Sequence, residues 1–372
     1  MRKFSSWILT GATGFVGQSL LRRWDREALP IDIVALCRPG SLGKIQPRTN
    51  RSGARLEVLA IGDFVSGNAR PTYCALVHLA GLTKWSAGEE EALKSNYVLT
   101  VDLVDTVAAN NPDARFVYCS TAMTQPYESE VEPAIVCGDR KFRNYYELSK
   151  FRAERYVEES GLPFSIVRPP LITGERGSGW CQGYQGLYHL LRLFARGFLP
   201  ALPGLATSRI NAVPSDDVAN SILMAAMPSA PATIELIAGN ATPSLEQFMR
   251  IGRELINCER YALGKAPIAP PRFISVEQWF RIFRPMLVRE CGKRVAEAAT
   301  ILDHFLPYIN ITRQNTNSDA TVTCTVNEDY FRSVVSYWAH ENGHIVRKDT
   351  FDWNRGFGNG DRGLAGTLPA GA

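Results

Sequence analysis

Tyr146 and Lys150 are the two side chains whose types and spacing best suit catalysis. They stand four positions apart in a stretch with helical periodicity, so one face of the expected helix carries both. A free tyrosine has a pKa of about 10 and is a poor acid at neutral pH. We expect the nearby ammonium to lower that pKa and make the tyrosine a usable proton donor. The spacing alone is weak support, because helices contain many such pairs by chance.

A pair of hydroxyl side chains, Ser120 and Thr121, ends an apolar run upstream of the tyrosine. Parallel α/β sheets bind ligands beyond the carboxyl ends of their strands, where a hydroxyl can hydrogen-bond a substrate oxygen. Either residue could also be an ordinary polar strand end. The pair gains weight because a tyrosine, a lysine and a glycine-rich loop accompany it.

The glycine-rich loop lies near the N-terminus, after an apolar strand and before a helical pattern. Gly11 permits the tight turn, Gly14 lets the backbone approach a pyrophosphate, and Gly17 allows close packing of helix on strand. The helix N-terminus offers free N–H groups and a positive dipole end to phosphates. We therefore favour dinucleotide binding over an ordinary turn, with contacts from Thr10, Gly11, Thr13, Gly14, Phe15, Val16 and Gly17.

The position after the second expected strand bears on the choice of dinucleotide. NAD sites often have Asp or Glu there to bind the ribose 2′-hydroxyl. This chain has Arg38 instead, which can pair with a 2′-phosphate, so we expect NADP(H). Asp63, expected at the end of the third strand, could contact the adenine or close a turn. Ala80 and Gly81, at the end of the fourth, would let backbone lie near the cofactor.

Strand-like and helix-like stretches alternate through the first part of the chain. Long apolar runs separated by helices predict a parallel sheet covered on both faces, a Rossmann-type doubly wound α/β fold. Helical periodicity is expected over 93–109 and 145–159. Six runs read as strands: WILTG, IDIVALC, LEVLAIGD, ALVHLAG, RFVYCSTA and PFSIVRPP.

The chain length favours one large unit with a smaller, mostly helical substrate-binding and C-terminal part. We expect an NADP-binding domain over 1–265, with inserted substrate-binding segments at about 175–212 and 240–265. Residues 266–354 have a helical, aromatic composition and form the C-terminal part. The last 18 residues, 355–372, contain six glycines and are predicted to be disordered.

Composition indicates an ordinary globular protein, with 45% hydrophobic and 21% charged residues. The net charge of +4 is small and the basic residues form no single run, so we do not expect a nucleic-acid partner. Eight cysteines without a CxxC pair suit buried thiols in a reducing cytosol. We see no signal peptide and no run long enough to span a bilayer, and expect a cytoplasmic protein, with peripheral membrane contact left open.

The order of these motifs resembles the extended short-chain dehydrogenase/reductases over roughly residues 5–240. The resemblance rests on TGATGFVG, HLAG, Asn96, CSTA, YELSK, VRPP and VPSDDVA. It implies that Thr121, with Ser120 beside it, is the catalytic hydroxyl, that Tyr146 is the acid/base and that Lys150 is its partner. It also implies that Asn96 and Pro169 belong to the cofactor site. A homodimer through helices on the outer face of the sheet is a family expectation, and the sequence leaves the oligomeric state open.

Within that family the chain looks most like fatty acyl-CoA reductases and carrier-bound thioester reductases. The likeness lies in NYYELSK, in HLAG followed by Trp85, in Gly179-Trp180 and in the segment 305–308, FLPY. It implies NADPH-dependent reduction of an acyl thioester to an aldehyde or an alcohol. The leucine-rich stretch 186–205 could be an acyl lid or a core helix, which periodicity cannot separate.

Other interpretations remain at this stage. A nucleotide-sugar epimerase or dehydratase, or a hydroxysteroid-type dehydrogenase, would use the same residues, and Arg192, Arg196 and Arg209 could bind a second pyrophosphate. A non-catalytic NADP-binding sensor usually lacks the tyrosine or the lysine. His340-Glu341-Asn342-Gly343-His344 matches a zinc-protease pattern, but no glutamate follows it as third ligand, so we expect no metal site.

Overall fold

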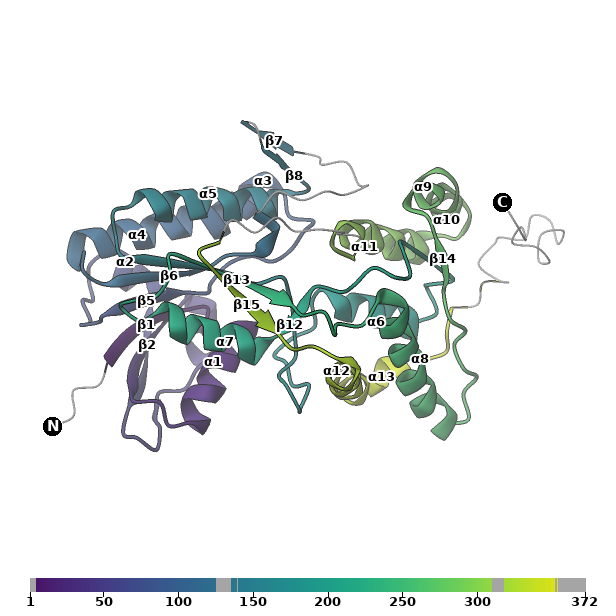
Figure 1. Ribbon diagram of the computed structural model, residues 1–372, viewed down its shortest axis with the longest axis horizontal. Coiled ribbons are helices and arrows are strands. Elements are labelled where there is room, and N and C mark those ends of the chain that lie inside the picture. The colour runs from purple at the N-terminus through teal and green to yellow at the C-terminus, as the bar shows by residue number, and fades with distance from the viewer. Residues whose placement is uncertain (1–4, 125–134, 139, 310–317, 352, 354–372) are drawn as a thin grey trace.

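A nine-stranded sheet forms the centre of the molecule (Figure 1). The computed structural model describes residues 5–124, 135–138, 140–309, 318–351 and 353. The strand order is β15-β13-β9-β6-β5-β1-β2-β4-β3, and within this sheet each pair of neighbouring strands is parallel except β3 with β4. The strands are β1 (Ser5–Thr10), β2 (Ile31–Cys37), β3 (Arg48–Thr49), β4 (Arg55–Ala60), β5 (Ala75–His78), β6 (Arg115–Cys119), β9 (Phe164–Arg168), β13 (Thr233–Ala238) and β15 (Ala320–Cys324).

Helices cover both faces of this sheet, which gives three layers (Figure 1). One face carries α2 (Ile61–Val65), α4 (Leu99–Asn110) and α5 (Tyr145–Glu159), whereas α1 (Phe15–Arg26) and α7 (Ser215–Ala225) cover the other. Neighbouring residues of one strand enter different cores: Ile8 packs with the first set of helices and Leu9 with the second. Both faces therefore need apolar side chains, which explains the continuous apolar runs in the sequence.

Most of the remaining elements extend the molecule beyond the carboxyl ends of the strands, whereas β7 and β8 stand beside α5 (Figure 1). The helices among them are α3 (Glu89–Ala92), α6 (Leu187–Ala195), α8 (Leu245–Ala262), α9 (Val276–Gln278), α10 (Arg284–Glu290), α11 (Lys293–Ile309), α12 (Glu328–Glu341) and α13 (Gly343–Val346), with π-helical turns at Leu93–Val98 and Trp279–Phe283 and 3₁₀ turns at Pro39–Lys44 and Ala122–Thr124. Three small sheets pair β7 (Ile135–Cys137) with β8 (Arg140–Phe142), β10 (Leu171–Thr173) with β12 (Ala212–Pro214), and β11 (Ala201–Pro203) with β14 (Arg272–Ile274).

The predicted α/β fold is confirmed, and all six predicted strands occur. The third strand ends earlier than expected, at Ala60, and the chain turns at once into α2. Asp63 is therefore an exposed residue of that short helix and not the end of a strand, which corrects its expected place. The helix expected over 93–109 is present, although it begins with a π-helical turn.

The C-terminal part contributes a strand that its composition did not predict. β15, from residues 320–324, pairs in parallel with β13 at the edge of the central sheet. The segment 266–354 is thus joined to the sheet as well as to the helices, while a domain boundary at 265 stays a prediction. The predicted disordered tail, 355–372, lies outside the described residues.

The leucine-rich stretch belongs to the core: α6 occupies 187–195, and β11 follows at 201–203. Within 186–205, the side chains of nine apolar residues are buried in the larger hydrophobic core, namely Leu187, Tyr188, Leu190, Leu191, Leu193, Phe194, Ala195, Leu199 and Leu202. These side chains pack against the protein itself, so they are not free to cover a ligand as a lid.

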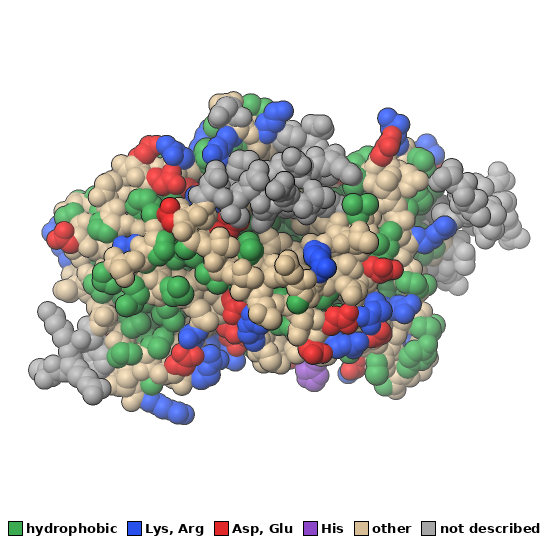
Figure 2. Space-filling view, viewed as in Figure 1, with side chains coloured by type: hydrophobic (Ala, Val, Ile, Leu, Met, Phe, Trp, Pro, Cys, Tyr) green, Lys and Arg blue, Asp and Glu red, His purple; other side chains and the backbone are tan. Residues whose placement is uncertain are grey.

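The surface and the thiols give further tests of the sequence-based expectations. On the face in Figure 2, acidic and basic side chains are interspersed and do not gather into one basic patch. All eight thiols are free, but Cys74 and Cys258 are exposed, contrary to the expectation of burial. No helix among the described residues is both long and apolar enough to cross a membrane.

Gly17 provides a test of the close packing between α1 and the glycine-rich loop. A Cβ at this position would stand 2.1 Å from the Gly11 carbonyl oxygen, so we expect Gly17→Ala to lower the free energy of unfolding by roughly 1–3 kcal/mol. Gly62→Ala, on the exposed side of α2 with no atom within 4 Å of its Cβ, is the matched control. Denaturant unfolding of both variants measures the difference, and equal stabilities would contradict the packing argument.

Candidate active site

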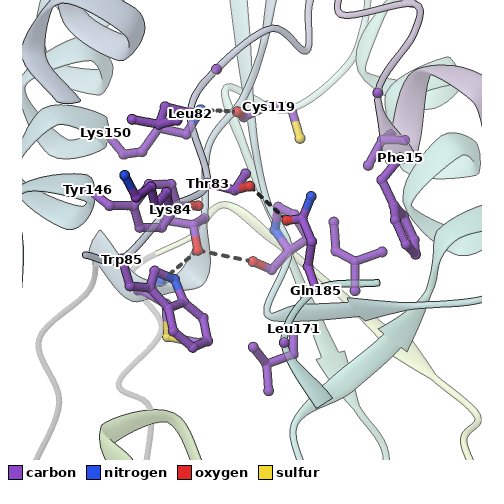
Figure 3. Close-up of a pocket in the computed structure, with 18 of the residues that line it drawn as sticks. Phe15, Leu82, Thr83, Lys84, Trp85, Cys119, Tyr146, Lys150, Leu171 and Gln185 are labelled. Atoms are coloured by element: carbon purple, nitrogen blue, oxygen red, sulfur yellow. Dashed lines mark hydrogen bonds between the residues drawn. The ribbon is translucent and has the colours of Figure 1, made fainter. Parts of the chain in front are cut away.

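A cavity of about 610 Å³ lies at the carboxyl ends of β1, β5 and β6 (Figure 3). Parallel register brings these ends to one edge of the sheet, since Thr10 aligns with His78 and His78 with Tyr118. The wall of the cavity comes from segments far apart in sequence: 11–17, 79–86, 119–123, 146–150, 169–172, 184–189 and 301–305. All four predicted catalytic residues line the cavity, namely Ser120, Thr121, Tyr146 and Lys150.

The glycine-rich loop has the features that a dinucleotide phosphate requires. Gly14 is the N-cap of α1 and has no side chain that could cap the first turn, which also contains no acidic residue. The N–H groups of that turn are therefore available to an anion. Gly11 has a φ of +72°, and a Cβ there would lie 2.6 Å from the Ala80 nitrogen, so glycine is required.

The predicted cofactor residues divide into two groups in the structure. Seven line the cavity: Gly11, Gly14, Phe15, Val16, Gly17, Gly81 and Pro169, in addition to Lys150. Six do not line it: Thr10, Thr13, Arg38, Asp63, Ala80 and Asn96. Among these, Arg38 is exposed directly after β2, the strand next to β1 in the sheet.

The Lys150 ammonium is held at the end of β6. Its Nζ donates a 2.7 Å hydrogen bond to the carbonyl oxygen of Cys119, as Figure 3 shows. A Cβ on Gly81 would stand only 3.6 Å from this Nζ, so the small residue leaves room beside the cation. Burial lowers the pKa of Lys150 to about 8, which keeps the cation predominant at pH 7.

Tyr146 lies one turn earlier on the same helix and is also buried. Burial raises its pKa well above the usual value of about 10, although a hydrogen bond with the Thr121 side chain acts in the opposite direction. The expected lowering by Lys150 is therefore wrong for this structure, because loss of hydration outweighs every favourable contact. A neutral phenol at physiological pH is nevertheless the form that can donate a proton.

Ser120 and Thr121 bring two further hydroxyls to the cavity. Thr121 Oγ1 accepts from the Met123 backbone N–H at 3.3 Å and hydrogen-bonds to Tyr146. Ser120 Oγ is buried and has no partner among the described residues. A bound polar group could satisfy it, so the site suits a ligand that carries a hydrogen-bonding oxygen or nitrogen.

Asn96 connects the loop after β5 to the helix that carries Tyr146. Its Oδ1 accepts from Leu82 N–H at 2.6 Å, and its Nδ2 donates to Leu82 O at 3.1 Å and to Ser149 Oγ at 2.9 Å. Ser149 Oγ in turn donates to the Tyr146 carbonyl at 2.8 Å. The buried Asn96 side chain therefore fixes the backbone of the loop after β5 to the first turn of α5 without itself lining the cavity.

Thr10 reaches this network through buried His78. Thr100 Oγ1 donates to the Asn96 carbonyl at 2.5 Å, so it must accept from His78 Nε2, and His78 Nδ1 then accepts from Thr10 Oγ1 at 2.7 Å. Burial and the Lys150 charge lower the pKa of His78 to about 3, which keeps the ring neutral, as these hydrogen bonds require. The Thr10 side chain thus joins β1 to β5 and does not face the cavity.

Several cavity residues were not identified from the sequence. Ile301, His304 and Phe305 of α11 form one wall, and Trp85 and Gln185 come from the loops after β5 and before α6. Thr83 Oγ1 donates to Gln185 Oε1 at 2.7 Å and joins these two loops (Figure 3). The spacing of 301, 304 and 305 marks one helix face, but nothing in the sequence relates that face to Tyr146.

The zinc-protease pattern is divided between two helices. α12 ends at Glu341 and α13 begins at Gly343, with Asn342 between them. His340 and His344 consequently do not share the face of one continuous helix, which the metal-binding pattern needs.

Comparisons with known proteins show which families and structures this chain resembles. The family model described as male sterility protein, an NAD-binding domain, matches residues 72–222. A Drosophila melanogaster protein named as a fatty acyl-CoA reductase is 26% identical over 184 residues, which is 40% of this chain and 34% of that protein. The chain thus spans about a third of the length of this relative.

Solved structures agree on the fold. The terminal R domain of the myxalamid biosynthetic pathway has a TM-score of 0.66 at 17% identity, with 91% of this chain and 92% of that one covered. A thiolation-reductase di-domain of an archaeal non-ribosomal peptide synthetase has a TM-score of 0.63 at 17% identity, with 92% of this chain and 76% of that one covered. A Bacillus cereus UDP-glucuronic acid 4-epimerase in complex with NAD has a TM-score of 0.55 at 14% identity, with 90% of this chain and 96% of that one covered.

These comparisons confirm the predicted resemblance to extended short-chain dehydrogenase/reductases. They support a nicotinamide-binding oxidoreductase, and they do not separate NAD from NADP.

The pKa of Lys150 predicts how nicotinamide dinucleotide binding varies with pH. The ammonium predominates below about pH 8, so affinity that depends on it falls as the pH rises through 8. The free energy of unfolding varies in the opposite direction. The unfolded chain keeps the Lys150 proton up to about pH 10.5, so the contribution of Lys150 to the free energy of unfolding rises between about pH 8 and pH 10.5. Fluorescence titration should show weaker wild-type binding above about pH 8, and weaker, pH-independent binding by Lys150→Met. A wild-type affinity that is constant beyond pH 9 would contradict the assignment.

Proposed function

We propose that the chain reduces an acyl thioester, bound to coenzyme A or to a carrier, to an aldehyde or an alcohol with NADPH. The observation that carries the proposal is the composition of one cavity. The glycine-rich loop and Lys150 lie at one part of it, the hydroxyls of Tyr146, Thr121 and Ser120 lie beside them, and an apolar wall completes it. That wall includes Trp85, Leu171, Ile172, Ile301 and Phe305.

Each residue of the proposed site has a role that its contacts support. Bound NADPH would supply the hydride. The N–H groups of α1 would bind its pyrophosphate, and Lys150 would hold its nicotinamide ribose. Tyr146 and Thr121 would stabilise the oxyanion that forms at the thioester carbonyl. Collapse of the hemithioacetal releases a thiol and an aldehyde, and Tyr146 could give its proton to the aldehyde oxygen if a second reduction follows.

The lining of the cavity favours an acyl substrate over a nucleotide sugar. A second pyrophosphate would need several cationic groups, but among the described lining residues only Lys84 and Lys150 carry a full positive charge. Arg192, Arg196 and Arg209 are absent from the lining, and Arg209 Nη1 donates to the carbonyls of Asn240 and Thr242. Two of the similar proteins are named as reductases, which agrees with this preference.

Replacement of Tyr146 tests the reaction. We expect Tyr146→Phe to lower the rate of NADPH oxidation with acyl-CoA substrates by a factor on the order of 10²–10⁴, because the acid and one oxyanion donor are lost. Tyr145→Phe removes a hydroxyl from the neighbouring residue, which does not line the cavity, and should keep the wild-type rate. A panel of acyl-CoA esters of graded length, UDP-sugars and sterols identifies the substrate class. Turnover with UDP-sugars alone, or near-full activity of Tyr146→Phe, would refute the proposal.

Replacement of Arg38 tests the choice of NADPH. The exposed guanidinium after β2 forms no ion pair with any of the described residues, so it is available to a 2′-phosphate. We expect Arg38→Asp to raise the Kd of NADPH by roughly 10–100-fold through a lost charged hydrogen bond, with little change for NADH. Arg51→Asp, the same charge change at another exposed position, should leave both values unchanged. An equal effect of Arg38→Asp on both dinucleotides would favour NAD.

A further inference from the structure

A buried contact from the C-terminal part reaches the first turn of the helix that carries Tyr146. Tyr308, near the end of α11, is only 4% exposed. Its hydroxyl accepts from Asn144 Nδ2 at 2.7 Å and donates to Glu147 Oε1 at 2.7 Å. One phenol therefore bridges two residues that flank the proposed acid/base in sequence.

Asn144 and Glu147 together define the start of α5. Asn144 is the N-cap, and its side-chain oxygen accepts from the Glu147 backbone N–H at 3.1 Å. Tyr146 lies between them, in the turn that this cap closes. A cap fixes the backbone direction of the first helical turn. The bridge from Tyr308 thus holds the first turn of α5, whose backbone determines the position and direction of the Tyr146 side chain.

Glu147 is buried completely and is also held by Arg143. The Arg143 guanidinium lies 2.6 Å from Glu147 Oε1, and the Arg143 backbone N–H donates to Oε2 at 3.0 Å. The guanidinium carbon also stands 4.6 Å from the centre of the Tyr308 ring. A buried carboxylate needs such partners, because an unpaired charge away from water is costly. Loss of the Tyr308 hydroxyl would therefore change the environment of a charge adjacent to Tyr146.

The other side of Tyr308 belongs to the cavity wall. Its ring stacks on Trp85 with centroids 4.0 Å apart, and Trp85 lines the cavity. The preceding turns of α11 supply Ile301, His304 and Phe305 to the same cavity. Positions 301, 304, 305 and 308 share one helix face, so the face that lines the cavity also contacts α5.

We propose that Tyr308 is a positioning residue: its hydroxyl, shared between Asn144 and Glu147, fixes the first turn of α5 and so aims Tyr146 at the substrate carbonyl. The inference rests on the proposed function. In this arrangement α11 forms part of the apolar wall and also contacts the turn that carries Tyr146, so the wall and the acid/base belong to one packed unit. A small displacement of a catalytic group lowers the rate of the chemical step more than it lowers substrate affinity.

Tyr308→Phe is the informative variant. It keeps the ring, its stacking on Trp85 and its contact with Arg143, and removes only the hydroxyl. With the acyl-CoA that the wild type reduces best, we expect kcat to fall at least tenfold, while KM for the thioester and Kd for NADPH stay within about twofold. A contact that only supports the fold would leave kcat unchanged in the folded protein.

Tyr156→Phe is the matched control on the same helix. Tyr156 also donates from its hydroxyl to a carboxylate at 2.7 Å, that of Asp105, but it is half-buried and lies nearly three turns beyond Tyr146. We expect wild-type kcat for this variant. Equal kcat values for Tyr308→Phe and Tyr156→Phe would overturn the proposal.

Asn144→Ser tests the same bridge from the other side and serves if Tyr308→Phe does not fold. Serine retains the N-cap preference but is too short to replace the amide that donates to Tyr308. We expect a fall in kcat, and a double variant with Tyr308→Phe that is less impaired than the product of the two single effects. Multiplicative effects would show that the two groups act separately and would refute the bridge.

Amide hydrogen exchange separates this inference from the proposed function, because it needs no substrate. The peptide over residues 143–150 should exchange faster in Tyr308→Phe than in wild type or in Tyr156→Phe. Faster exchange without any thioester turnover by the wild type would refute the proposed function and support the link between α11 and α5. Unchanged exchange would refute the inference even if thioester reduction is confirmed.

Discussion

The arrangement of the cavity depends on keeping one lysine cation inside the protein. Lys150 is 5% exposed, and its ammonium donates to a backbone carbonyl and forms no ion pair within the described part of the chain. Burial of a charge is costly, and it lowers the pKa of Lys150 to about 8 although the Glu154 charge acts in the opposite direction. The cation nevertheless persists at neutral pH because the carbonyl at the end of β6 is aimed at it. Small residues beside it, Gly81 above all, leave space for a ligand next to the charge.

A network of buried hydrogen bonds near the lysine fixes the positions of the surrounding loops and helix. Asn96 ties the loop after β5 to Ser149, and Thr10, His78 and Thr100 extend that network to β1. Every step is buried, so each donor must have an acceptor if the fold is to be stable. The glycine-rich loop and the helix that carries Tyr146 are thereby connected through hydrogen bonds as well as through the sheet.

Local patterns in the sequence were sufficient for the sheet and for part of the site. Apolar runs identified six strands because both faces of the sheet are covered, and the loop at Gly11–Gly17 carries its own local signature. The wall from α11 was missed because its distance from Tyr146 in space depends on how the C-terminal part packs. The raised pKa of Tyr146 was missed for a related reason: burial is a property of the folded protein. Leucine periodicity in α6 is the same for a lid and for a core helix, and only the packing decides.

The placement of α11 bears on how acyl substrates could be selected. An apolar wall that merely binds the chain would lower KM, whereas binding energy raises kcat only if it is realised in the transition state. Here the wall residues Ile301 and Phe305 are on the same rigid helix as Tyr308, which contacts the turn that carries Tyr146. A substrate that packs well against this helix would stabilise the arrangement in which the acid is aimed correctly. Poorly fitting acyl groups would then be rejected in the chemical step as well as in binding.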